Sequence, residues 1–74
     1  MNSVLVFTDA DGSEYNVVIK HIAGWNFAKG VTIIVTDYNW NFSINGDYTQ
    51  EIRKVVLAPQ KGQMYRLGEG WYNV

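Results

Sequence analysis

Few residues in this chain of 74 have the types and the spacing that catalysis requires. His21 is the only histidine, and the sequence around it shows neither a nucleophile nor an acid at a motif distance. The three serines, Ser3, Ser13 and Ser43, lack the glycine-flanked context of a nucleophile elbow. We therefore expect no catalytic residue, no enzyme activity and no cofactor.

Two short segments invite comparison with ligand-binding loops. The segment 9–14 partly resembles a calcium loop, but only two acids, Asp9 and Asp11, precede Gly12, where such a loop needs ligands at three alternating positions. The segment 68–70 contains two glycines, but neither the lysine nor the helix of a phosphate-binding loop follows it. Both segments are predicted to be turns, and no metal site is expected.

Aromatic side chains carry the main indication of function. Three Trp, five Tyr and three Phe are more than a core of this size easily holds, so some must be partly exposed. Exposed Tyr and Trp dominate the hot spots of protein interfaces. We expect either a protein-contact patch or, as the alternative, packing at the rim of the core. The residues expected to contact a partner are Tyr38, Tyr48, Tyr65, Trp71 and Tyr72.

Basic residues in the last third of the chain suggest a second kind of partner. Residues 49–74 carry only two acids beside four bases, which are Arg53, Lys54, Lys61 and Arg66. Small barrels bind single-stranded nucleic acid by stacking bases on aromatic rings along a basic groove. The net charge of −1 argues against a strongly electrostatic nucleic-acid binder and against an acidic DNA mimic. Nucleic-acid binding is therefore the alternative to protein contact.

Strands must position these side chains. Alternating patterns and β-branched residues predict strands over 3–8, 14–22, 31–36, 40–44, 55–57, 64–67 and 71–74. The run 31–36 is expected to be either buried on both faces or central in its sheet, since it is apolar at successive positions. Alternation assigns Phe7, Phe42 and one of Trp25 or Trp40 to the core.

The connecting segments are less regular. Residues 23–30 are predicted to be a connector whose aromatic residues, Trp25 and Phe27, either cover the core or form a contact surface. The dipeptide 45–46, Asn-Gly, is the strongest hairpin signal in the chain. Residues 47–58 fit either a single helical turn capped by Thr49 or a continuous strand ending at Pro59.

The expected fold is all-β, a single domain over residues 1–74. It is a five- to six-stranded antiparallel SH3-like barrel or sheet with at most one short helical turn. The runs 8–12, 31–38 and 51–55 resemble small SH3-like or Sm-like barrels and, in layout, the β-barrel core of bacterial WYL-type domains. This resemblance covers residues 3–58 and implies the fold alone. The Trp-Tyr-Leu signature of that family is absent, and Asn39, Trp40 and Asn41 stand where its basic cluster is expected.

Composition narrows the setting of the protein. No signal peptide, membrane-spanning run or cysteine is visible, so the cytosol is the expected compartment and no membrane partner is expected. A small non-catalytic domain with surplus aromatics fits an adaptor or an inhibitor of a larger complex, such as phages and mobile elements encode. Self-association is a variant of the same protein-binding hypothesis.

Overall fold

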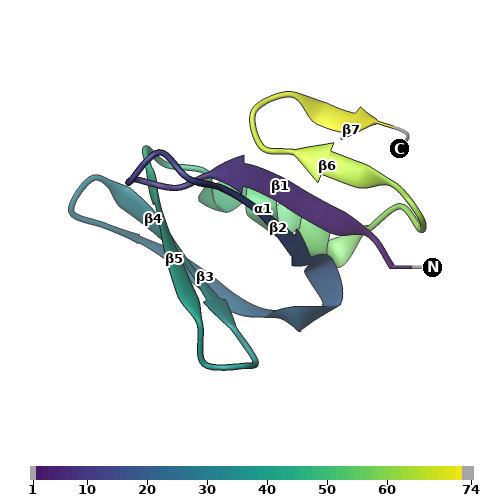
Figure 1. The fold of residues 1–74 in the computed structure, drawn as a ribbon, viewed down its shortest axis with the longest axis horizontal. Helices are drawn as coiled ribbons and strands as arrows, with labels where there is room; N and C mark the ends of the chain where they lie inside the picture. Colours follow the sequence, from purple (N-terminus) through teal and green to yellow (C-terminus); the bar gives the residue numbers. More distant parts are fainter. Residues whose placement is uncertain (1, 73–74) are drawn as a thin grey trace.

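The computed structural model describes residues 2–72, which form two small sheets and one helix (Figure 1). The four-stranded sheet has the order β2-β1-β6-β7, and the three-stranded sheet has the order β3-β4-β5. The first comprises β1 (Val4–Thr8), β2 (Glu14–Val18), β6 (Met64–Arg66) and β7 (Gly70–Tyr72). The second comprises β3 (Ile22–Ala28), β4 (Val31–Thr36) and β5 (Asn41–Asn45). A short 3₁₀ helix, η1 (Ile19–His21), joins β2 to β3, and the helix α1 (Thr49–Leu57) follows β5.

β1 and β2 form a hairpin, which confirms the strand predicted over 3–8 and the turn predicted after it. The strand predicted over 14–22 ends at Val18, because residues 19–21 form η1. Val4 pairs with Val18, and the antiparallel ladder runs to the turn after Thr8. Asp9 fixes the turn, because its Oδ1 accepts the N–H groups of Asp11 at 3.0 Å and of Ser13 at 2.9 Å. Gly12 lies at φ +89°, a region that glycine enters without steric cost.

The strand β4 is central in its sheet, as its sequence predicts. On one face Ile34 is fully buried, and Thr32 is buried beside it. On the opposite face Val35 is exposed, so the strand is covered on one side only. Its continuous apolar run therefore reflects a central position rather than burial on both faces.

The connector predicted over 23–30 is wrong, because most of it forms β3. This strand pairs with β4 across the turn of Lys29 and Gly30, whose φ angles are +54° and +81°. Two successive positive φ values are typical of a type I′ hairpin turn. The Asn45-Gly46 dipeptide, predicted to be such a turn, instead leads from β5 toward α1.

The helix α1 is longer than the single predicted turn, and the strand predicted over 55–57 is wrong. Ile52 and Val55 are buried on one face of the helix, three residues apart. Asp47 supports the first turn, because its Oδ1 accepts both the N–H and the hydroxyl of Thr49. A helix of nine residues is unstable in isolation, so α1 depends on the burial of its apolar face. Within residues 2–72, no helix has the length and apolar character to cross a membrane.

The closed barrel and the purely antiparallel arrangement are also wrong. The described residues form seven strands rather than five or six, in two separate open sheets. β1 and β6 are parallel, with Val4 opposite Met64. Parallel neighbouring strands need a long connection between them. Here the connection from β1 to β6 contains all the elements from β2 to α1. The coarser expectation of a mostly-β fold is confirmed.

The core lies where the inner faces of both sheets meet α1. Phe7 and Phe42 are buried as predicted, with ring centroids 5.3 Å apart in an edge-to-face contact. Of the two tryptophans left open by the sequence, Trp25 packs against the core and Trp40 is exposed. The fully or nearly buried residues of the core are Leu5, Phe7, Val17, Ile19, Ile22, Ile34, Phe42, Ile44, Ile52 and Val55.

Candidate functional site

Three of the five predicted contact aromatics are half-buried against the core. Tyr65 pairs with Leu5 on one side and with Trp71 on the other, so both aromatic rings share the inward-facing side of the sheet. Their ring centroids lie 5.1 Å apart in an edge-to-face contact. Tyr48 also packs against the core. These three residues therefore contribute to the packing that holds β6 and β7 in place.

Tyr65 also joins the last hairpin to α1. Its hydroxyl donates to Oε2 of Glu51 at 2.7 Å, and the same oxygen accepts the N–H of Gly68. Burial, together with the hydrogen bond and the negative charge of Glu51, raises the pKa of Tyr65 to about 12. The sequence shows no local signal of this contact, because 14 residues separate the two side chains.

Tyr72 lies on the opposite side of the same sheet. The pairing register places Val18, Val4, Met64 and Tyr72 in one row across all four strands. Val6 follows Val4 on this side and is only 1% exposed, although it faces away from the core. We call these five residues the outer face.

Charged and polar side chains border the outer face. Arg66 lies in the row of Val6, and its Nη1 donates to Oε1 of Glu14 at 2.7 Å across β1. This hydrogen bond raises the pKa of the Arg66 guanidinium above its usual value. Asn16 pairs with Val6 on the other flank. The outer face thus consists of a partly exposed apolar row, the buried Val6 and bordering polar side chains.

α1 lies behind β1 and β2 in Figure 1, on the core side of the four-stranded sheet. The helix therefore covers the inner side and leaves the outer face without an overlying element among the described residues. Next to Tyr72 is a hollow of about 300 Å³, lined by Arg66, Glu69, Gly70, Trp71 and Tyr72.

The four basic residues predicted to bind nucleic acid lie on different parts of the molecule. Lys61 borders a hollow of about 340 Å³ together with Lys20. Lys54 borders another that also contains Glu51 and Glu69. Arg66 is ion-paired on the outer face, and Arg53 is exposed on α1. The described structure therefore does not bring these four bases into one groove.

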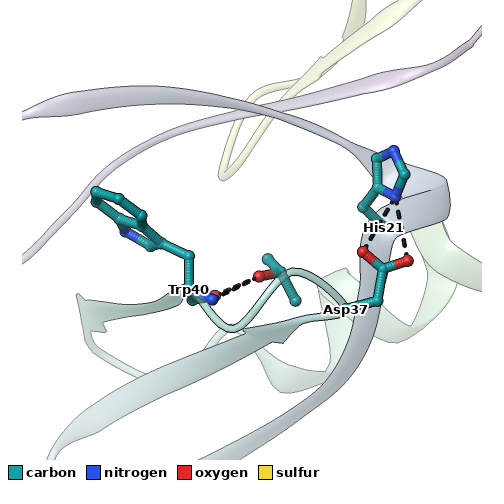
Figure 2. Close-up of polar contacts among 4 residues, drawn as sticks. His21, Asp37 and Trp40 are labelled. Carbon is teal, nitrogen blue, oxygen red and sulfur yellow. Dashed lines mark hydrogen bonds and ion pairs between the residues drawn. The ribbon is translucent and has the colours of Figure 1, made fainter.

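Tyr38, the fifth predicted contact residue, lies apart from the others in the β4–β5 turn and is 50% exposed. Its ring meets that of His21 edge-on at 5.9 Å. His21 in turn has an acid partner that no sequence motif indicates. Its Nδ1 lies 3.1 Å from both carboxylate oxygens of Asp37 (Figure 2). The pairing of β3 with β4 brings the two residues together.

The His21–Asp37 pair resembles two members of a hydrolytic triad. Such a pair acts on substrate only when the second ring nitrogen faces a nucleophile. Within residues 2–72, the imidazole makes hydrogen bonds through Nδ1 alone. The pair joins η1 to the β4–β5 turn, and the N–H of Asp37 donates to the carbonyl of His21 at 2.9 Å as well.

Comparison of the chain with protein-family models, with curated proteins and with solved structures finds no match. The resemblance to SH3-like, Sm-like and WYL-type domains therefore stays a prediction from the sequence.

Proposed function

We propose that the chain is a small non-catalytic protein-binding module that contacts its partner through the outer face. The observation that carries this proposal is the row of Val18, Val4, Met64 and Tyr72, which crosses four strands without a charged residue. Protein interfaces combine an apolar centre with a polar rim and are enriched in Tyr, Met and Arg. The Arg66–Glu14 pair supplies such a rim.

Tyr72 is the anchor of this surface. It is 37% exposed at the border of the sheet, next to the hollow that Arg66 and Trp71 help to line. Hot spots form where aromatic or Arg side chains of one protein meet a hollow of the other. A partner side chain that enters this hollow contacts Tyr72 and Arg66 together.

The partner is proposed to be a larger complex that this module regulates, as an adaptor or an inhibitor. Self-association through the same face is the variant, since a twofold axis would place two copies of the apolar row against each other. Both variants use the same residues, so sedimentation of the purified chain over a range of concentrations separates them.

Photo-crosslinking in the host tests the proposal. A photoreactive amino acid at position 72 should capture one protein, and the same group at position 35 should not. Val35 is the matched control, because it is also 37% exposed but lies on the other sheet.

The captured protein is then purified and titrated with variants. Tyr72→Ala should weaken binding at least about tenfold, as expected for a hot spot, whereas Val35→Ala should leave it unchanged. Equal capture from both positions, or equal affinity of both variants at unchanged melting temperature, would contradict the assignment of the outer face.

Binding of single-stranded nucleic acid is the second candidate, supported by the position of Arg66 beside Tyr72. An aromatic ring next to a guanidinium provides a stacking surface and a phosphate contact. Fluorescence anisotropy with a labelled oligothymidylate at low salt tests it, because the electrostatic contribution is largest there. Absence of binding at low salt removes this candidate and leaves the first untouched.

A further inference from the structure

A further hollow lies near the C-terminal end of β1, between the β1–β2 turn and β5. It has a volume of about 350 Å³, near the lower end of the range for ligand pockets, so it suits a group the size of one side chain. We call it the acidic aromatic cleft. It is lined by Asp9, Ala10, Asp11, Tyr15, Trp40, Asn41, Phe42 and Ser43.

Trp40 forms one wall and is 56% exposed. Its indole stacks on the buried Phe42, with ring centroids 6.2 Å apart and planes 28° from parallel. Its backbone is held by Thr36, whose hydroxyl donates to the Trp40 carbonyl and accepts the Trp40 N–H. Figure 2 shows the indole pointing away from the His21–Asp37 pair. A large ring is thus fixed in place with much of its surface open to solvent.

Two acidic residues, Asp9 and Asp11, also line the cleft. The turn that carries Asp9 and Asp11 is tied to β5, because the N–H of Ala10 donates to the carbonyl of Ser43 at 2.8 Å. Oδ1 of Asp9 accepts hydrogen bonds from backbone N–H groups of the turn. The side chain of Asp11 makes no hydrogen bond to any described residue. The lining residues include two acids and no base, so the cleft is negatively charged beside the exposed ring of Trp40.

We propose that the acidic aromatic cleft binds an arginine side chain presented by a partner protein. The planar guanidinium stacks on the face of Trp40, the aromatic ring that attracts cations most strongly. Its N–H groups donate to the carboxylates of Asp11 and Asp9 as charge-assisted hydrogen bonds. Lysine fits less well, because its ammonium group is a compact, strongly hydrated charge that does not stack.

This site is separate from the outer face, since the two share no residue. The inference therefore does not rest on the proposed function. An experiment that contradicts one of the two proposals does not contradict the other.

NMR titration of the ¹⁵N-labelled chain tests the site with two acetylated and amidated tripeptides, Gly-Arg-Gly and Gly-citrulline-Gly. Citrulline has the shape of arginine but no charge. The arginine peptide should shift the indole N–H of Trp40 and the amide of Asp11 in a saturable manner. The indoles of Trp25 and Trp71 lie outside the cleft and serve as internal controls, with each signal assigned from a Trp→Phe variant.

The citrulline peptide should bind at least about fivefold more weakly, and Asp11→Asn should weaken the arginine peptide by about threefold, as expected for an exposed charge pair. Trp40→Ala should abolish saturable binding. If that variant melts at a lower temperature, Asp11→Asn still tests the site, because Asp11 makes no hydrogen bond through its side chain within the described chain.

Three results would overturn the inference. Equal affinity for the citrulline peptide would show that charge plays no part. A neutral oligosaccharide that shifts the same signals at lower concentration would identify the cleft as a carbohydrate site. Shifts that stay absent, or that grow without saturation and equally at all three indoles, would show that no arginine site exists.

Discussion

The hydroxyl of Thr32 accepts the backbone N–H of Tyr48 at 2.8 Å and donates to the carbonyl of Gly46 at 2.6 Å. Thr32 is fully buried in the central strand β4, and the segment that it holds leads from β5 into α1. One side chain therefore fixes where the helix begins relative to the three-stranded sheet.

Replacement of this hydroxyl should be costly. Thr32→Val keeps the shape of the side chain but leaves one N–H and one carbonyl without their partner, so it should lower the free energy of unfolding by about 1–3 kcal/mol. Thr32→Ser retains the hydroxyl and should cost less. Urea denaturation of both variants checks the difference, and a Thr32→Val variant as stable as the parent would show that water replaces both bonds.

Tyr65 should make stability fall at alkaline pH. Its pKa is raised to about 12 in the folded chain from 10.0, so its contribution is fully present below pH 10 and is lost as the pH rises toward 12. Tyr65→Phe should remove this part of the pH dependence. The measurements are the free energy of unfolding across that range and the ultraviolet absorbance of tyrosinate. A parent and a variant with the same slope would contradict the raised pKa.

Ile34 should be one of the most sensitive positions of the core. It is fully buried, whereas its neighbour Val35 is exposed on the other side of the same strand. Ile34→Ala should lower stability by about 2–5 kcal/mol because it leaves a cavity, and Val35→Ala should cost less than about 1 kcal/mol. Comparable losses at both positions would mean that a further surface covers Val35.

Gly46 should resist substitution for a backbone reason. It lies at φ +99°, and an added Cβ would come 3.4 Å from the ring of Tyr48. Gly46→Ala should therefore cost about 1–2 kcal/mol. Gly24→Ala is the matched control, since that glycine has no positive φ and nothing lies within 4 Å of its added Cβ. Thermal unfolding of the pair distinguishes strain at Gly46 from a general effect of losing glycine.

Some elements of the fold could be predicted from neighbouring residues alone. Asp9 and Gly12 specify the first hairpin through turn chemistry, and the alternation around Phe7 and Phe42 identifies both as core residues. Ile52 and Val55, by contrast, fit a helical turn or a strand equally well. Only the packing of α1 against both sheets decides in favour of the helix.

The candidate site likewise combines residues that local sequence indicates with contacts that only the tertiary structure creates. Tyr72, Trp71 and Arg66 can be proposed as contact residues from the sequence alone. The contacts of Glu51 with Tyr65 and of His21 with Asp37, by contrast, depend on how distant segments pack. Alternation alone does not decide which of Trp25 and Trp40 is buried, and Trp40 is the exposed one. Trp25 packs against the core instead, because it lies opposite the buried Ile34 on β4.

The sequence by itself determined that neighbouring residues such as Trp71 and Tyr72 face opposite sides of a strand, because the pleat of the backbone alternates side chains locally. Only the tertiary structure decided which of those sides is covered. That depends on where α1 and the second sheet pack, and long-range burial rather than local conformation sets their place.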